Sequence, residues 1–259
     1  MNIAVCIKQV PDTSATISIK PDKKGIDESA IKWIINPYDE FAIEQALQLK
    51  EKIGDAAKVT VISVGPAKVQ EALRTAMAMG CDEAVHIQTE DRWSLDHLSV
   101  SKVLAHAVQE AQAKLVFLGR HAIDDDSGHT GPMLATMLNW SQACFVQTFE
   151  WSDDHIQVGK DLEGGRTQTW KIDLPAVVTT TKGLNQPRYA SLKGIMAAKK
   201  KPLHTKTLAD VGVDASAASV TWSEFFVPVQ ERKRKIFKDG LPGDVEQVVT
   251  LLREEAKVL

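Results

Sequence analysis

Residues 115–132 read LVFLGRHAIDDDSGHTGP, and the first four of these residues are all apolar. A short apolar run that ends in a glycine-containing loop indicates a strand buried on both faces of a parallel sheet. The same pattern occurs earlier in the chain, in residues 3–7 (IAVCI), 59–64 (VTVISV) and 84–87 (AVHI). The sequence therefore predicts a sheet with central parallel strands.

Amphipathic segments separate these apolar runs. Asn36 followed by Pro37 predicts a helix start with Asn36 as the N-cap, and the helix is expected to run to about Lys52. Two further helices are expected over residues 68–79 and 98–114. The alternation of strands and helices predicts an α/β protein with an open, doubly wound, mainly parallel sheet of the Rossmann-like type.

The pattern changes after residue 138. Short β-like segments separated by turn residues follow, and we expect them to add antiparallel strands to the sheet. These segments are residues 145–151, 155–160, 167–172 and 176–181.

Periodicity is weak and the composition basic from residue 184 to about 241, and only residues 244–257 again indicate a helix. A loosely patterned segment of this length is usually functional or an interaction arm. We therefore predict an α/β domain over residues 1–183, followed by a loop and an extended C-terminal arm over residues 184–259.

The composition excludes several classes of protein. The 259 residues include 31 basic and 34 acidic ones, for a net charge of -3, so no general field attracts nucleic acid. The three cysteines form no CxxC pair, which argues against a zinc site or a disulfide framework. No apolar window is long enough to span a membrane, and the N-terminus does not resemble a signal peptide. We expect a soluble intracellular protein without membrane insertion or nucleic-acid binding.

Loops at the carboxyl ends of the strands are where an open α/β sheet binds ligands. Such loops begin at Lys8 and include residues 33–38, 64–66 and 119–132. The last one combines three glycines with the hydroxyls of Ser127 and Thr130 close to an expected helix start, a composition that suits a phosphate. We interpret it as the backbone cradle of a mononucleotide.

Asp124, Asp125 and Asp126 complicate this interpretation, because carboxylates repel a phosphate unless they point away or bind backbone amides. A solvated acidic turn is therefore the alternative. The standard dinucleotide and P-loop fingerprints are both absent from the sequence.

No set of residues suggests a self-sufficient catalyst. His121 and His129 share the acidic loop but lack the fixed spacing of metal ligands, so we expect no metal site. Ser127 and His129 match a catalytic triad in composition only, since no nucleophile elbow is present. The six tryptophans are scattered along the sequence and predict no stacking platform. These features favour a binding or carrier subunit.

Ordered motifs along nearly the whole chain resemble the β subunit of electron transfer flavoprotein. They are VCIKQVPD (5–12), INPYDEFAIEQAL (35–47), VGPAKVQEALRTAMAMGCDEAVHI (64–87), LGRHAIDDDSGHTGPMLA (118–135), VGKDLEGGRTQTWKIDLPAVVTTT (158–181) and LNQPRYASLKGIMAAKKKPL (184–203). Six motifs in the same order are far more specific than any one of them.

The resemblance implies an adenine nucleotide alpha hydrolase-like sheet that binds AMP in a structural role. It also implies a heterodimer with an α subunit, which holds most of a redox-active FAD and against which the C-terminal arm packs. Electrons would come from acyl-CoA or related flavin dehydrogenases, as in fatty acid β-oxidation, and leave to a quinone oxidoreductase or another acceptor. By position, the AMP contacts fall on Cys6, Asn36, Pro37, Tyr38, Asp39, Val64, Gly119, Arg120, His121, Ala122, Ile123, Asp124, Asp125, Asp126, Ser127, Gly128, His129 and Thr130.

Leu192 matches the leucine with which this family anchors its recognition loop in a dehydrogenase. Tyr189, Ile195 and Met196 are expected beside it, while Arg188 and the nearby lysines would adjust orientation and encounter rate. The alternative is an ordinary linker whose leucine packs on its own domain.

Two further functions stay open at this point. In electron-bifurcating relatives, which oxidise NADH, a second FAD replaces AMP. Asp125 stands where those relatives tend to have glycine, which favours AMP, but they share the Gly131-Pro132 pair, and Gly128-His129 replaces an Asn-Gln pair that is usual in AMP-binding members. A stand-alone nucleotide-binding protein of the stress type is the third possibility. We expect the bacterial cytoplasm as the location, or the mitochondrial matrix if the source is eukaryotic.

Overall fold

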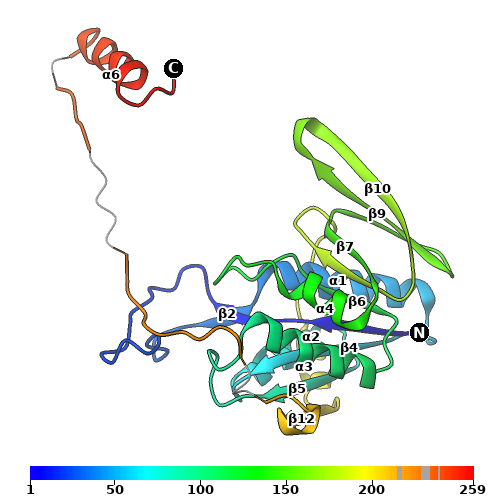
Figure 1. Ribbon diagram of the computed structural model, residues 1–259. Coiled ribbons are helices and arrows are strands. Elements are labelled where there is room, and N and C mark those ends of the chain that lie inside the picture. The colour runs from blue at the N-terminus through cyan, green and yellow to red at the C-terminus, as the bar shows by residue number, and fades with distance from the viewer. Residues whose placement is uncertain (215–217, 229–233, 239) are drawn as a thin grey trace. The chain divides into compact units, whose positions relative to one another are not determined.

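Seven parallel strands form the central sheet, in the order β12-β5-β4-β1-β6-β11-β7 (Figure 1). In this computed structural model, residues 1–214, 218–228, 234–238 and 240–259 are described. The bounds of the strands are β1 (Asn2–Cys6), β4 (Lys58–Gly65), β5 (Glu83–Gln88), β6 (Leu115–Gly119), β7 (Ser141–Val146), β11 (Ala176–Thr180) and β12 (Leu203–Thr207). The predicted doubly wound, mainly parallel α/β sheet is confirmed, and the four runs predicted as central strands are its neighbouring strands β5, β4, β1 and β6.

Helices cover both faces of this sheet. They are α1 (Pro37–Ile53), α2 (Val69–Met79), α3 (His97–Glu110) and α4 (Thr130–Leu138). Successive strand residues point to opposite faces, so Ile3 and Val5 of β1 pack into one core with α1 and α2. Ala4 and Cys6 pack into the other core with α3 and α4. Apolar strands covered on both sides explain why the runs carry no polar alternation.

One helix end and one helix cap differ from expectation. The third helix ends at Glu110 rather than at Lys114, and Gln112 has a left-handed φ of 51° in the turn that follows. Asn36 precedes α1 as predicted, but among the described residues no side chain, including its own, forms the capping bond. The Asn36 side chain instead binds the backbone of His121 and Ile123.

Antiparallel strands occur beside the central sheet. β10 (Arg166–Asp173), β9 (His155–Leu162) and β8 (Thr148–Trp151) form a three-stranded sheet, whose long β9–β10 hairpin projects in Figure 1. A two-stranded ribbon joins β2 (Gln9–Pro11) to β3 (Trp33–Ile35). The expectation of an antiparallel strand was wrong for residues 176–181, because β11 pairs in parallel with both β6 and β7. All five of its residues are buried, which is the pattern of a central strand.

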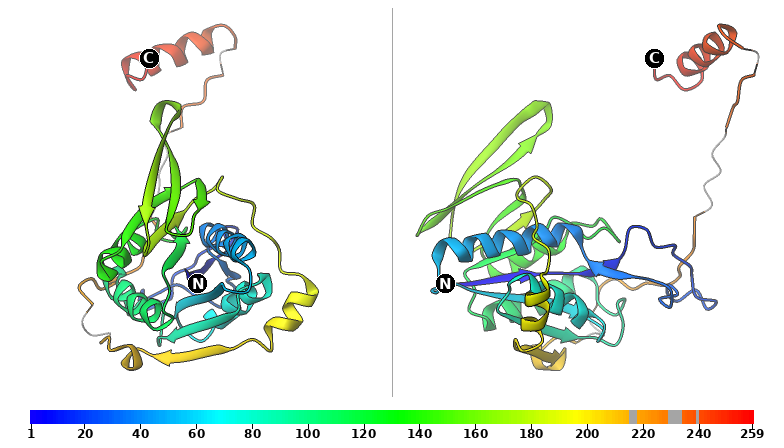
Figure 2. Two further views of the ribbon diagram at one scale, coloured as in Figure 1. Left: turned by 90° about the vertical axis from the view of Figure 1, so that its right-hand side faces the viewer. Right: turned by 180° about the vertical axis from the view of Figure 1, so that it is seen from behind.

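Residues after 183 contribute to the sheet as well. The chain leaves β11 and forms α5 (Leu192–Ala198) on the side of α2. It then enters β12 at the opposite edge of the sheet, beside β5, and Figure 2 shows this course around the outside of the helices. By its internal contacts the chain divides into Met1–Phe225 and Phe226–Leu259. The packing of residues 184–259 on a partner remains a prediction.

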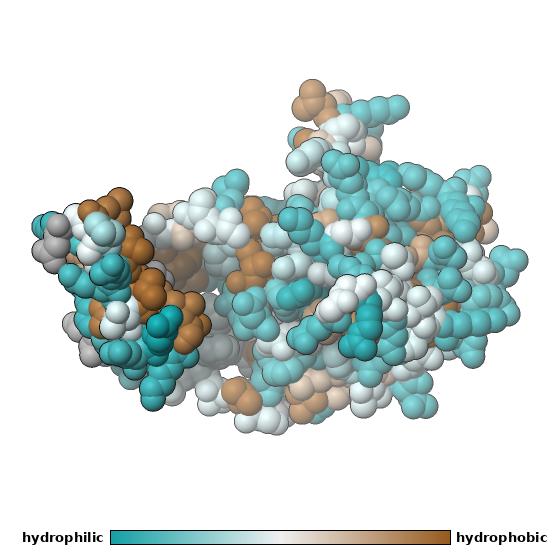
Figure 3. Space-filling model, turned by 90° about the horizontal axis from the view of Figure 1, so that it is seen from above, coloured by the Kyte–Doolittle hydropathy of each residue, from teal (hydrophilic) through white to brown (hydrophobic). Residues whose placement is uncertain are grey.

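Among the described residues of the unit Phe226–Leu259 there is one helix, α6 (Gly243–Glu254), in place of the helix expected over residues 244–257. Its apolar side chains Val245, Val248, Val249 and Leu252 are exposed. Hydrophobic residues accordingly gather along this helix, at the left of Figure 3. Of the helices described here, none is both long and apolar enough to cross a membrane.

Candidate functional site

A cavity of about 1190 Å³ lies at the carboxyl ends of β1, β4 and β6, the edge at which open α/β sheets bind ligands. Most of the residues predicted to bind a nucleotide line it. They are Cys6, Asn36, Asp39, Val64, Gly119, Arg120, His121, Ala122, Ile123, Asp124, Asp125, Ser127, Gly128, His129 and Thr130. Pro37, Tyr38 and Asp126 lie outside this lining. Lys8, Arg92, His97 and Gly131 also line the cavity but were not among the predicted site residues.

Asp39 holds two strand ends together below the cavity. Its carboxylate accepts hydrogen bonds from the backbone N–H groups of Lys8, at 2.7 Å, and Gly119, at 2.8 Å. Burial raises the pKa of Asp39 to about 7, although both backbone hydrogen bonds act in the opposite direction. A single acidic side chain thus fixes the loops that follow β1 and β6.

Asn36 fixes the middle of the loop between β6 and α4. Its Nδ2 donates to the carbonyl oxygen of His121 at 2.9 Å, and its Oδ1 accepts from the N–H of Ile123 at 3.2 Å. The Asn-Pro pair that signals the helix start therefore also places an amide where it satisfies two backbone groups of the acidic loop.

Glycines allow the backbone to come close at both ends of this loop. A Cβ on Gly119 would overlap the Asp39 carboxylate and lie 2.7 Å from Cβ of Tyr38. A Cβ on Gly131, in the first turn of α4, would lie 2.5 Å from Cγ2 of Thr179. Gly128 has a left-handed φ of 63°, which favours glycine. These positions explain the glycine pattern of the sequence in steric terms.

The aspartates of the loop are neutralised or turned aside. Lys8 Nζ donates to Asp124 at 2.8 Å and to Asp125 at 3.0 Å. Burial alone would lower the pKa of Lys8, but these two carboxylates outweigh it and raise that pKa, so the side chain stays charged. Asp125 also accepts from the N–H of Ser127 at 3.0 Å, while the Asp126 side chain is exposed and lies 3.3 Å from His121 Nε2. Lys8 thus offsets one of the two charges of Asp124 and Asp125, which reduces the predicted repulsion of a phosphate.

Tyr38 supports the cavity wall from behind. Its ring meets the His121 ring edge-on with centroids 4.5 Å apart, and the Arg120 guanidinium lies 5.2 Å from its centroid. The rings of His97 and His129, which also line the cavity, contact each other with centroids 5.4 Å apart. At the N-terminus of α4, no side chain of the described part of the chain forms a capping bond, so the first amides of this helix lack that partner.

Aromatic residues gather at the mouth of the cavity, although the tryptophans among them lie far apart in the sequence. Trp222 stacks on Phe225 with centroids 5.6 Å apart, and Trp93 meets both rings edge-on. The chain brings them together because the Ser219 and Val220 N–H groups bind the Asp96 carboxylate. Residues so far apart in sequence give no local signal of this cluster.

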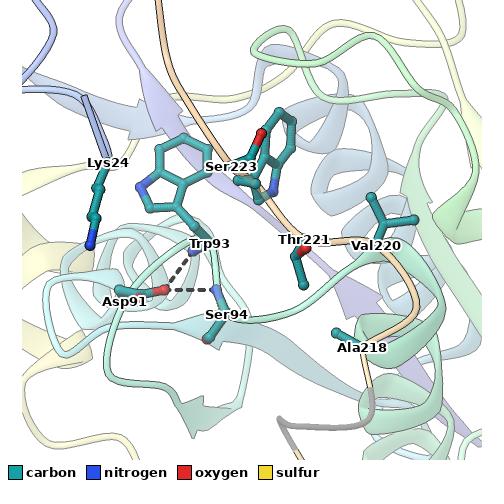
Figure 4. A pocket seen from close by; sticks show the side chains of 9 residues that line it. Lys24, Asp91, Trp93, Ser94, Ala218, Val220, Thr221 and Ser223 are labelled. Atoms are coloured by element: carbon teal, nitrogen blue, oxygen red, sulfur yellow. Dashed lines mark hydrogen bonds between the residues drawn. The ribbon is translucent and has the colours of Figure 1, made fainter. Parts of the chain in front are cut away.

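A second, smaller cavity of about 510 Å³ adjoins these aromatics (Figure 4). One wall is formed by Asp91, Trp93 and Ser94, where the Asp91 carboxylate accepts from the other two backbone N–H groups at 2.7 Å each. Residues 220–223 form the facing wall. Because Asp91, Trp93 and Val220 line both cavities, the smaller one is an extension of the mouth.

Cys6 lies in the lining of the larger cavity. Burial raises the pKa of the Cys6 thiol far above its ordinary value, so the thiolate nucleophile is suppressed. Within the described residues, no group of three or more His, Cys, Asp or Glu side chains could hold a metal ion.

The predicted recognition loop presents apolar side chains to solvent. Leu192 is 82% exposed and Tyr189 is 96% exposed, and Met196 and Ile195 are exposed beside them. Ser191 is the N-cap of α5, and its hydroxyl accepts from the N–H of Gly194 at 3.0 Å. The alternative of a leucine packed on its own domain is therefore not what the structure has.

Polar contacts hold this loop on the domain. Arg188 binds Glu44 and Glu51 of α1, so its guanidinium is engaged within the chain rather than free to steer a partner. After α5, the Arg74 guanidinium donates to the carbonyl oxygens of Ala198, at 2.6 Å, and Lys201, at 3.0 Å. The apolar side chains thus stand on a fixed frame.

A family model described as the electron transfer flavoprotein domain matches residues 24–211. The chain is similar over its whole length to "Electron transfer flavoprotein subunit beta" of Bradyrhizobium diazoefficiens, with 42% identity over 260 residues covering all of both chains. The protein of that name from Bacillus subtilis is 40% identical over 262 residues, again covering both chains fully. "Electron transfer flavoprotein subunit beta, mitochondrial" of Arabidopsis thaliana is 38% identical over 261 residues, with full coverage of both.

Proposed function

The chain belongs to the electron transfer flavoprotein family as a β subunit, and from that premise we propose that it binds AMP and docks a flavin dehydrogenase in a heterodimeric electron carrier. Its partner is an α subunit that holds most of the FAD. Electrons enter from acyl-CoA or related flavin dehydrogenases and leave to a quinone oxidoreductase or another acceptor. The flavin supplies the redox chemistry, while the protein supplies positioning and electrostatics.

The larger cavity fits a mononucleotide. Its volume exceeds what a ligand of that size needs, and Gly119 and Gly131 stand where a side chain would obstruct the approach of backbone to a ligand. Residues 127–131 would hold the phosphate, because the first amides of α4 lack a capping bond from the described side chains and a helix N-terminus favours an anion. Bound there, AMP has a structural role and takes no part in electron transfer.

Asp124 and Asp125 support AMP over a second flavin. Lys8 pairs with both carboxylates, and Asp125 stands where electron-bifurcating relatives tend to have glycine. Extraction of the purified heterodimer followed by identification of each nucleotide separates the two functions. One FAD and one AMP per heterodimer support the carrier, whereas two FAD support a bifurcating enzyme that oxidises NADH.

The single observation that carries the docking assignment is the exposure of Leu192 on a fixed frame. A large apolar side chain held 82% exposed is a ready anchor for a pocket on another protein. Lys193, Lys199 and Lys200, three cations close to it in the sequence, suit an acidic rim around that pocket. A stand-alone nucleotide-binding protein would have no use for such a surface.

Leu192→Ala tests this assignment. Removing a central interface anchor typically costs about 2 kcal/mol or more, so we expect the rate of flavin reduction by an acyl-CoA dehydrogenase to fall about 30-fold at subsaturating carrier. Flavin and AMP content should not change, because Leu192 lies outside the cavity lining. Unchanged transfer rates would remove the docking role, and Leu162→Ala, at another exposed leucine, is the matched control.

A further inference from the structure

We propose that Glu44 is a positioning residue for docking: by holding Arg188 it fixes the chain from which Leu192 projects. The inference rests on the proposed function, since it assumes that Leu192 contacts the dehydrogenase. It concerns how the surface is held rather than which side chain touches the partner.

Glu44 receives three hydrogen bonds from one residue. Its Oε2 accepts from the Arg188 Nε at 2.7 Å and from the Arg188 backbone N–H at 3.2 Å, and its Oε1 accepts from Nη2 at 3.0 Å. Gln48 Nε2, one turn further along α1, donates to the same Oε1 at 2.9 Å. Bonds to both the guanidinium and the backbone of Arg188 fix the position of the chain as well as that of the side chain.

Burial distinguishes Glu44 from the second carboxylate that Arg188 binds. Glu44 is only 4% exposed, whereas Glu51, the other carboxylate bound by Arg188, has a side chain that is 62% exposed. Burial alone would raise the pKa of Glu44, but the hydrogen bonds from Arg188 and Gln48 outweigh it, so that this pKa lies below its ordinary value. Without Arg188, Glu44 would be a buried charge lacking its cation, which opposes release of the loop.

The contact between Glu44 and Arg188, called the clamp from here on, lies close to the docking side chains in sequence. Tyr189 directly follows Arg188, and Leu192 is four residues on, after the N-cap Ser191. A second contact precedes the clamp, where Asn185 Nδ2 donates to the carbonyl oxygen of Phe41, also in α1, at 3.0 Å. The entry to the docking loop is therefore fastened to α1, and ordering it in advance lowers the cost of binding a partner.

The test uses the complete heterodimer as electron acceptor for a purified acyl-CoA dehydrogenase. We expect Glu44→Gln and Arg188→Gln each to raise the KM for the carrier about tenfold while kcat stays unchanged, because the loop must then be ordered on binding. Arg188→Lys keeps the charge and should recover part of that loss. Lys32→Gln is the control. It removes an exposed ion pair in which Lys32 Nζ lies 3.1 Å from Asp12, and it should leave the KM unchanged.

A double-mutant cycle separates this proposal from the proposed function. If Glu44 acts through the docking loop, Glu44→Gln should raise the KM much less in the Leu192→Ala background than alone. Equal increases in both backgrounds, or no increase with Glu44→Gln while Leu192→Ala is impaired, would overturn the positioning role and leave docking intact. An unimpaired Leu192→Ala would instead refute the proposed function.

Folding of the variants is followed independently. Hydrogen exchange of the 189–192 amides should accelerate in Arg188→Gln, with flavin content close to wild type. Should Arg188→Gln fail to assemble, Glu44→Gln and Arg188→Lys give the same readout. Unchanged exchange in an assembled variant would contradict the clamp.

Discussion

The cavity loop, residues 119–130, and the docking loop, residues 184–201, use polar and apolar groups in opposite ways. In the cavity loop, polar groups point inward, where Asp39 and Asn36 bind its backbone amides and carbonyls. In the docking loop, the polar side chain of Arg188 points back to the domain and Leu192 points to solvent. In the function proposed above, one loop encloses a small ligand and the other offers an anchor to a large one.

Both loops are held by the same helix. Asn36 and Asp39, at the start of α1, serve the cavity loop, and Glu44, lying further along it, serves the docking loop. The difference teaches that a helix can support two surfaces of opposite character when the acidic residues of successive turns face different neighbours. The predictions below alter one loop at a time.

The largest effect is expected from Gly119→Ala, at the start of the cavity loop. The new Cβ would overlap the Asp39 carboxylate and press on Tyr38, and overpacking of this kind costs about 3 kcal/mol. Denaturant unfolding of the heterodimer and its nucleotide content should both report the loss. Gly243→Ala, whose Cβ would meet no described atom within 4 Å, is the control. Wild-type stability in Gly119→Ala would contradict the close approach described for this loop.

Asp39→Asn should have an intermediate effect of about 2 kcal/mol, because an amide cannot accept both backbone N–H groups as the carboxyl group does. Its pH dependence is the sharper test. With a folded pKa of about 7 and an unfolded one near 4, the folded chain holds the extra proton between those values. Wild-type stability should therefore fall as pH rises from about 4 to 7, by at most about 1.4 kcal/mol per unit.

The amide side chain of the variant Asp39→Asn cannot titrate, so this fall should be absent from it. The stability advantage of the wild type over the variant is expected to be greatest near pH 4 and to shrink towards pH 7. Thermal melts of both heterodimers across this range measure it. An advantage that grows with pH would show that Asp39 is held ionised, contrary to the burial of its carboxyl group.

The smallest effect is expected from Gly194→Ala, in the docking loop. A Cβ there would overlap the carbonyl oxygen of Ala78 in α2 and push α5 outward. Since α5 is short and lies at the surface, it can shift, and we expect a stability loss near 1 kcal/mol together with a severalfold higher KM for the carrier. Loss of AMP from this variant would show that the two loops are not independent.

Much of the cavity could be predicted because its signals are local. The run Leu115–Gly119 and the glycines after it identify a buried strand and a loop at its carboxyl end, wherever the other strands lie. The Asn36-Pro37 pair likewise marks a helix start from neighbouring residues alone. What Asn36 binds could not be predicted, because His121 and Ile123 are distant in sequence.

The features that could not be predicted from the sequence depend on contacts between distant segments. Nothing beside Lys8 in the sequence indicates that it neutralises Asp124 and Asp125. Strand β12 was missed for the same reason: none of its five residues is buried, because it lies at an edge of the sheet where only β5 pairs with it. Sequence patterns predicted elements and motifs, whereas pairing, burial and charge balance depended on the assembled sheet.

Strand β12 has a consequence for biosynthesis. During translation β5 emerges early, but its outer edge stays unpaired until Leu203–Thr207 leave the ribosome, after the whole docking loop. An open edge of this kind is prone to wrong pairing. Its correct pairing is slow, because β12 is synthesised late and lies far from β5 in the sequence. Because the docking loop is fastened at its far end by β12, a nascent or truncated chain cannot display it in final form. Under the proposed function, recruitment of a dehydrogenase is thereby reserved for chains whose sheet is finished.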